Sequence, residues 1–187
     1  SGATVTVSIG GVTKTTTADS SGNWTLSGNE LDISALNNGI LTVSATQTDD
    51  AGNISTAAST SITLDNIAPN AVAITTPIAV DGIVNAAEDN AVLITGSGAE
   101  AGATVTVGIS GINATVIADS SGNWTLNGSE LDISALNNGT LTVSATQTDS
   151  AGNISSAATT TITLDNVAPN ALAITTPIAV DGIVNAA

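Results

Sequence analysis

The stretch from Leu64 to Asp89, LDNIAPNAVAITTPIAVDGIVNAAED, decides how the chain is divided. A β-forming run ends at Asp65, the connector Asn66–Pro69 follows, and a new β-forming run begins two residues after the proline. Pro69 has no backbone N–H to donate to a β-ladder and its ring fixes φ, so strand pairing is expected to break here. The stretch returns with two substitutions from Leu164 to Ala187. It therefore predicts a junction between tandem domains.

The repetition extends over most of the chain. Residues 1–87 align without gaps with residues 101–187, and 17 of these 87 positions differ, so 70 are identical. A period of 100 residues matches a whole domain and is too long for one unit of a solenoid. The chain is therefore expected to consist of domains in tandem.

Two divisions into domains are compatible with this period. We favour an N-terminally truncated domain over 1–67, a complete domain over 68–167, and the first strand and loop of a third domain over 168–187, because Pro69 makes a natural boundary. The alternative takes the two aligned segments as complete units joined by residues 88–100. The sequence alone leaves both divisions open.

Short runs of alternating apolar and polar residues indicate β-strands throughout. In the run 3–9, Val5, Val7 and Ile9 share one face and the threonines share the other, as expected for a half-buried strand. Further strands of the first domain are expected at 13–18, 24–26, 41–46 and 60–64. The complete domain is expected to have strands at 71–76, 91–97, 103–110, 113–118, 123–127, 140–148 and 158–164. Turn signals recur about every 8–12 residues, which predicts an all-β antiparallel sandwich.

The composition excludes several functions. The chain has no Cys and no His, so it has no disulfide, no thiolate metal site and no histidine base, and we expect no enzymatic activity. Sixteen acidic residues face one basic residue, giving a net charge of −15, which argues against nucleic-acid binding. No apolar run reaches the roughly 20 residues of a membrane span, so membrane insertion is not expected. Trp24 and Trp124 are the only aromatic residues and are expected to fill the cores.

Four motifs recur in the same order in both copies: ATVTV, ADSSGNWTL, LTVSATQTD-x-AGNIS and ITLDN-x-AP. In this respect the chain resembles the bacterial Ig-like tandem repeats of giant calcium-dependent adhesins of the RTX type. The resemblance implies Ig-like β-sandwiches strung in tandem on the bacterial cell surface, secreted and extracellular, in a protein of cell adhesion and biofilms. It also implies Ca²⁺ bound within and between domains and a role as a rigid extender.

Placed on an Ig-like topology, the acidic residues gather at the two ends of a domain. One end of the domain 68–167 is expected to collect acids and an amide from three loops and from the end of the preceding domain. These residues are Glu100, Asp119, Asp149, Asn153 and Asp65. The opposite end is expected to collect Asp81, Asn85, Glu88, Asp89 and Asp132. Counterparts in the other copies are Asp19, Asp49, Asp165 and Asp181.

These clusters point to Ca²⁺. The domain 68–167 contains nine acidic residues and no Lys or Arg, and unit charges about 4 Å apart repel by roughly 4 kcal/mol at an effective dielectric of 20. Ca²⁺ relieves this repulsion and accepts six to eight oxygen ligands, whereas Mg²⁺ demands a stricter octahedral geometry. An alternative interpretation of these acidic residues needs no metal. Asp and Asn stabilise turns through bonds to the local backbone, and an acidic surface keeps a protein soluble.

The leading functional hypothesis is an extender whose junctions are stiffened by Ca²⁺, with neighbouring repeats of the same chain as its partners. A second hypothesis is an adhesive module for a glycan, a surface or ice, which an exposed tryptophan or a flat threonine face would favour. A third is a filament subunit that associates head to tail, with residues 168–187 adding a strand to another copy. The adhesion ligand is not predicted.

Overall fold

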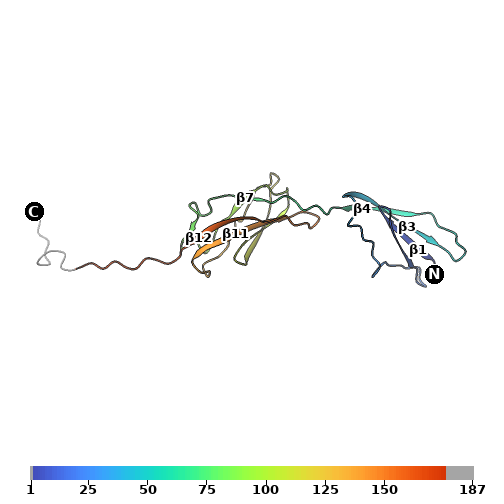
Figure 1. The fold of residues 1–187 in the computed structure, drawn as a ribbon, viewed down its shortest axis with the longest axis horizontal. Coiled ribbons are helices and arrows are strands. Elements are labelled where there is room, and N and C mark those ends of the chain that lie inside the picture. Colours follow the sequence, from blue (N-terminus) through green and yellow to red (C-terminus); the bar gives the residue numbers. More distant parts are fainter. Residues whose placement is uncertain (1, 176–187) are drawn as a thin grey trace, which may run out of the picture. The chain divides into compact units, whose positions relative to one another are not determined.

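A computed structural model describes residues 2–175, whose regular structure consists of strands (Figure 1). Among these residues, no helix is long and apolar enough to cross a membrane. The described residues form two compact units. The first takes those up to Asn70 together with Thr148–Ser156, and the second takes Ala71–Gln147 and those from Ala157 onward. Each unit is described by itself below.

The first unit contains one antiparallel sheet of four strands in the order β2-β1-β3-β4. Its strands are β1 (Thr4–Ile9), β2 (Val12–Thr17), β3 (Gly39–Thr48) and β4 (Ala58–Leu64). The alternation predicted from the sequence is confirmed, since Val5 and Val7 are buried while Thr4 is exposed. Between β2 and β3 the chain runs through turns, one of them closed by the Leu36 N–H donating to the carbonyl of Ile33 at 3.0 Å.

The second unit is a sandwich of two sheets. One sheet has the order β10-β7-β5 and the other the order β6-β12-β11-β8-β9. The strands are β5 (Ala73–Ile74), β6 (Ile83–Val84), β7 (Thr95–Ser97), β8 (Thr104–Ile109), β9 (Ile112–Ile117), β10 (Trp124–Thr125), β11 (Gly139–Thr148) and β12 (Ala158–Leu164). The predicted all-β sandwich is therefore confirmed, although β5, β7 and β10 are shorter than expected.

One strand was not predicted. Residues 77–90 were expected to form a loop, but Ile83–Val84 pairs in parallel with Thr163–Leu164 of β12. A strand of two residues is too short to show an alternating pattern, and its partner lies far away in the sequence. This pairing brings the segment that follows β6 to the end of the sheet where β12 finishes.

The core of the second unit lies between its two sheets and includes Trp124, which is 3 % exposed. Trp124 pairs with Gly96 of β7 in the β-ladder. A Cβ atom at Gly96 would come closer than 3.0 Å to the Trp124 ring and to the carbonyl oxygen of Ala73, a separation that real Cβ atoms essentially never show. Glycine is therefore required where β5, β7 and the indole meet.

The first unit differs at the equivalent place. Trp24 was expected in a core, but it is 45 % exposed, and residues 24–26 do not form the expected strand. Trp124 pairs with β7, whereas among the described residues of the first unit the sheet consists of β1 to β4 and no strand pairs with the backbone at Trp24. Without a partner strand, the backbone at Trp24 has no ladder to join.

Candidate functional site

Four aspartates each organise a tight turn with the sequence Asp-x-x-Gly-Asn. At Asp149, Oδ1 accepts hydrogen bonds from the Ala151 N–H (2.8 Å) and the Asn153 N–H (2.9 Å), while Oδ2 accepts one from the Asn153 side chain (2.9 Å). Asp49 makes the same three bonds with its own turn. In Asp19 and Asp119, Oδ1 likewise accepts from two backbone N–H groups. These carboxylates are held in a defined orientation by their own turns.

The same hydrogen bonds favour the ionised carboxylates. Backbone donation from Asn123 is the largest cause that lowers the pKa of Asp119, and donation from the Asn53 side chain is the largest for the pKa of Asp49. The side-chain amide of Asn153 has the same effect on the pKa of Asp149. A group that is already ionised coordinates a cation without first losing a proton.

Two of the predicted ligands are adjacent within the first unit. The Asn153 side-chain nitrogen donates to the backbone carbonyl oxygen of Asp65 at 3.3 Å. The Asp65 carboxylate accepts from the Asn38 side chain at 3.1 Å and from the Ile67 N–H at 3.2 Å. Asp65, Asn153 and the Asp149 turn therefore share one region of this unit.

A second group lies at the end of the second unit where β12 finishes. Asp89 is 6 % exposed, and its Oδ2 accepts a hydrogen bond from the Asn166 side chain at 2.9 Å. The Asn166 N–H donates to the Asn138 Oδ1, and the Asn138 amide donates to Asp165, both at 3.3 Å. Asp89 and Asp165, which are far apart in sequence, are thus joined through two asparagines.

The segment around β6 carries three more predicted ligands, with Asp81 before the strand and Asn85 and Glu88 after it. Asn85 donates its N–H to the Glu88 carboxylate at 3.1 Å, and its carbonyl accepts from the N–H groups of Glu88 and Asp89, both at 3.0 Å. Asp81 accepts from the Ile83 N–H at 2.8 Å. This compact turn places Asp89 so that its backbone carbonyl accepts from the Ile133 N–H at 2.7 Å.

Asp132 and Glu100 complete the predicted set within the second unit. Asp132 accepts from the N–H and the hydroxyl of Ser134, at 3.1 and 2.7 Å. At Glu100 the backbone N–H donates to the buried side chain of Gln147 at 2.7 Å. The remaining predicted ligand, Asp181, lies outside the described residues.

Within residues 2–175, no group of three or more acidic side chains is placed to hold a metal ion by itself. Any calcium site formed by these residues would therefore need amide or backbone oxygens beside the carboxylates. Such oxygens are present: Ser134 contributes a carbonyl that accepts from the Asn166 amide at 3.3 Å, beside Asp89 and Asn138. Carboxylate, amide and carbonyl oxygens are the ligands that suit Ca²⁺.

Sequence reasoning missed three contributors to these sites: Asn138, Asn166 and Gln147. The two asparagines follow the same spacing in the first unit, where the Asn66 N–H donates to the Asn38 Oδ1 at 3.3 Å. An asparagine that recurs in both copies just after the last strand was the available signal. Gln147 gave no such signal, because it reads as one polar residue in a strand.

Comparison with known proteins agrees with this architecture. Residues 1–66 and 74–166 match the family model of the bacterial Ig-like domain. No curated protein sequence matches the chain. One similar solved structure is that of a Ca²⁺-stabilised adhesin that helps an Antarctic bacterium reach out and bind ice. It is 30 % identical with a TM-score of 0.45, over 90 % of this chain and 41 % of that one.

Two further solved structures are similar. A tetra-tandem repeat from the extending region of a large adhesion protein is 27 % identical with a TM-score of 0.41, over 88 % of this chain and 42 % of that one. A bacterial immunoglobulin-like domain from the M. primoryensis ice-binding adhesin is 30 % identical with a TM-score of 0.36, over 53 % of this chain and 100 % of that one. The chain spans less than half of the Antarctic adhesin structure and of the tetra-tandem repeat. The second unit is a β-sandwich, the motifs recur in tandem, and the family model matches most of the chain. The chain therefore belongs to the bacterial Ig-like domain family.

Proposed function

We propose that this chain is a run of extender repeats from an extracellular adhesin of a bacterial cell surface, stiffened by Ca²⁺ at the junctions between domains and within them. The role is structural and not enzymatic. Its partners are the neighbouring repeats of the same protein, and it needs neither nucleic acid nor membrane insertion. Ca²⁺ is proposed as the cation because the candidate sites offer oxygen ligands only.

The observation that carries the proposal is a set of ionised carboxylates held ready by turns in a chain with almost no basic residues. Asp49, Asp119 and Asp149 each have both carboxylate oxygens engaged by turn donors. A carboxylate has about four lone-pair sites, so these bonds leave further sites for a cation. The family membership and the tandem period support a repeated structural element over a single active site.

Two regions are the proposed sites. The first is formed by Asp65, Asp149 and Asn153, with Asp119 and Glu100 as further proposed ligands. The second region is formed by Asp81, Asn85, Glu88, Asp89 and Asp132. The remaining proposed ligands are the counterparts of these residues in the other copies, namely Asp19, Asp49 and Asp165 for the first region and Asp181 for the second. Bound Ca²⁺ would neutralise the clustered charge and tie ligands from separate segments together.

The stiffening would act on the connector Asn66–Pro69. Asp65 precedes this connector, and its backbone carbonyl accepts a hydrogen bond from Asn153. A cation shared by Asp65 and the Asp149 turn would restrict the rotations of the connector, and its loss would release them. A site loaded at 100 times its dissociation constant would stabilise the bound form by about 2.7 kcal/mol.

The test is small-angle scattering and thermal unfolding of this chain in millimolar Ca²⁺ and then in EDTA. We expect a longer and better-defined maximum dimension with Ca²⁺, and a lower melting temperature after chelation. Asp65→Ala should reproduce the chelated state in the presence of Ca²⁺. Asp50→Ser is the matched control, because the other copy has Ser150 at this position. Identical scattering and melting with and without Ca²⁺ would refute the proposal.

A further inference from the structure

The five-stranded sheet of the second unit ends in an edge strand, β9. Among the described residues, β9 pairs with β8 and with no other strand. The Ala118 N–H donates to the Ala103 carbonyl at 3.0 Å, so every second residue back from Ala118 turns its backbone groups toward β8. The N–H and C=O groups of Asn113, Thr115 and Ile117 therefore point away from β8, to the free edge of the sheet.

The side chains of β9 leave this edge uncharged. Those of Ile112, Ala114 and Val116 are partly buried against the core, and the residues that alternate with them are exposed. Ile117, at the end of the strand, is 61 % exposed. The segment 110–118 contains no charged residue and no proline. An edge strand without charge or proline is open to pairing with another strand.

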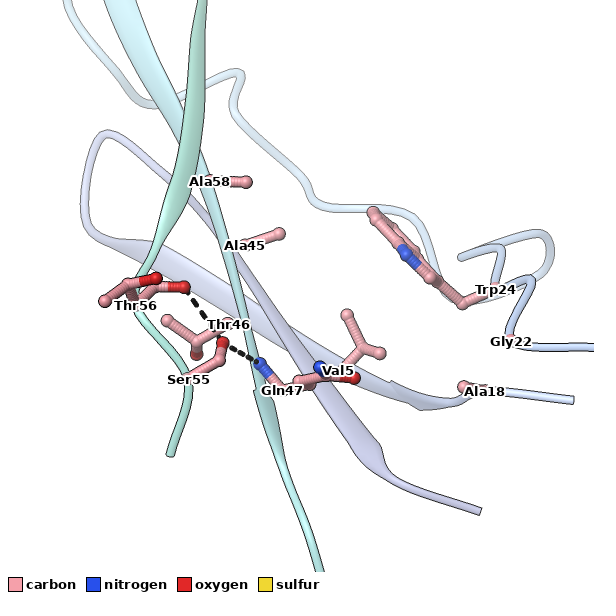
Figure 2. A pocket seen from close by; sticks show the side chains of 10 residues that line it. All are labelled: Val5, Ala18, Gly22, Trp24, Ala45, Thr46, Gln47, Ser55, Thr56 and Ala58. Atoms are coloured by element: carbon pink, nitrogen blue, oxygen red, sulfur yellow. Dashed lines mark hydrogen bonds between the residues drawn. The ribbon is translucent and has the colours of Figure 1, made fainter. Parts of the chain in front are cut away.

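The corresponding edge strand of the first unit, β2, carries a charge that opposes such pairing. Its Lys14 lies opposite Val7 of β1. Figure 2 shows Val5 pointing to the side where the Trp24 ring lies, while Thr46 points away. Val7 shares the face of Val5, and side chains directly opposite each other share a face, so Lys14 lies on the inner face of the sheet. An inward-pointing charge is one of the features that protect an edge strand from pairing.

A second feature of β2 is a side chain that covers its free edge. The Asn29 side-chain nitrogen donates to the Thr15 carbonyl at 3.1 Å, which occupies a backbone acceptor that an added strand would use. In the second unit, Ala114 stands in the place of Lys14, and Ser129 stands in the place of Asn29. Both features that protect β2 are therefore replaced at β9.

We propose that the β9 edge is a lateral interface with a second copy of this chain, in which two β9 strands pair antiparallel about a two-fold axis at Thr115. In this register Thr115 lies opposite the Thr115 of the second copy, and Asn113 lies opposite Ile117 in both directions. Cross-strand threonine pairs stabilise antiparallel pairing. The interface goes beyond the extender role, because it joins two separate chains side by side.

A second copy fits this edge because the edge is self-complementary. Each outward residue supplies one backbone donor and one acceptor, so two such edges satisfy each other. On the inner face the pairing places Ala114 of one copy beside Val116 of the other, which brings two apolar side chains together. Lys14 at the same position would instead place a charge beside the apolar residue of the partner strand.

The charge of the chain is compatible with this pairing. The net charge is −15, and the acidic residue nearest to the two-fold axis is Asp119, four positions from Thr115. Antiparallel pairing places the two Asp119 residues at opposite ends of the paired strands, roughly 27 Å apart at about 3.4 Å per residue. This separation exceeds the Debye length of about 8 Å at physiological salt, so their repulsion is screened.

A single pair of short strands is a weak interface, although repeats in tandem on two chains would pair several times at once. The experiment therefore traps one pair covalently. The chain has no cysteine, so Thr115→Cys supplies one thiol per chain. Directly opposite residues of a hydrogen-bonded antiparallel pair have Cα atoms about 5.5 Å apart, within the range of about 4.4–6.8 Å that a disulfide spans.

We expect Thr115→Cys chains to form disulfide dimers at least about tenfold faster than Thr15→Cys chains under the same mild oxidation, because pairing raises the effective concentration of the thiols. Thr15→Cys is the matched control, since Thr15 is also an exposed residue of an edge strand. Each rate is divided by the rate at which the same thiol reacts with a small aromatic disulfide, which corrects for thiol reactivity. Adding Ala114→Lys and Ser129→Asn, the residues of the first unit, should reduce the Thr115→Cys rate to that of the control.

A second readout shows whether the trapped strands are paired. Hydrogen exchange at the Asn113 and Ile117 amides should be slower in the disulfide dimer than in the reduced chain, while the Thr13 and Thr17 amides of β2 should not change. Equal corrected rates for the two cysteine variants would overturn the proposal. A Thr115→Cys rate that the two added substitutions leave unchanged would also overturn it, as would exchange at Asn113 and Ile117 that is the same in the dimer and the reduced chain.

Discussion

Replacing Gly96 by Ala tests the packing between Trp124 and the β5–β7 pair in the second unit. The added Cβ would lie closer than 3.0 Å to the Trp124 ring and to the backbone carbonyl of Ala73. Carbon atoms normally approach to about 3.5–4.0 Å, so these neighbours would have to move apart by roughly 0.5 Å or more. Backbone cannot yield as a flexible side chain does, and Trp124 is 3 % exposed in a closed core.

The expected cost follows from these contacts. Over-packing a core typically costs about 1–3 kcal/mol, and we expect about 3 kcal/mol because one of the colliding atoms belongs to the β5–β7 pair. For a domain of this size, each kcal/mol lowers the melting temperature by about 4–8 °C. Gly96→Ala should therefore lower the melting temperature of the second unit by about 12–24 °C.

The assay is thermal unfolding followed by Trp124 fluorescence in a Trp24→Phe background. Gly108→Ala is the matched control, because its Cβ would meet the flexible end of the exposed Asn113 side chain. The other copy also has Ser8 at the equivalent position, so a side chain is tolerated there. Melting of Gly96→Ala within about 2 °C of the parent, or an equal loss for Gly108→Ala, would refute the reasoning.

Two further predictions concern polar groups. Gln147→Leu removes the buried acceptor of the Glu100 N–H and should lower the free energy of unfolding of the second unit, measured in urea, by about 1–3 kcal/mol. Gln47→Leu is the control and should change this free energy little, because Gln47 is exposed. Equal effects of the two substitutions would contradict the prediction. Asp119→Asn should lower the melting temperature at neutral pH, and the deficit should shrink below about pH 4. The turn lowers the pKa of Asp119 in the folded state. The carboxylate therefore contributes to stability above its pKa in the unfolded chain, and this contribution is lost as the pH falls through its pKa in the folded chain. A deficit that does not change with pH would show that the ionised carboxylate is not its cause.

Much of the fold followed from local pattern. Alternation placed β1, β8 and β12 close to their observed bounds, because a strand with one buried face must repeat every second residue. The recurring motifs gave the period, and Trp124 was correctly expected in the core. The turn aspartates were also readable, because Asp-x-x-Gly-Asn turns are stabilised by bonds within five residues.

Part of the candidate site was readable in the same way, and part was not. The acidic residues could be assigned to the ends of a sandwich from the order of the strands. Their partners could not: the bond between Asn166 and Asp89 joins residues 77 positions apart, and Gln147 reaches Glu100 across 47 positions. Such pairs depend on how the loops close in space, which no local pattern encodes.

The sequence by itself therefore determined the β-rich class, the 100-residue period and the ionisable turns, since each depends on the chemistry of neighbouring residues. Only the tertiary structure decided three other features: the parallel pairing of Ile83–Val84, the bond from Asn166 to Asp89, and the unequal exposure of two tryptophans in identical local sequence. Trp24 and Trp124 lie in the same motif, yet one is open and the other is closed. The physical reason is that burial is a property of what packs against a residue, and that partner comes from a distant part of the chain.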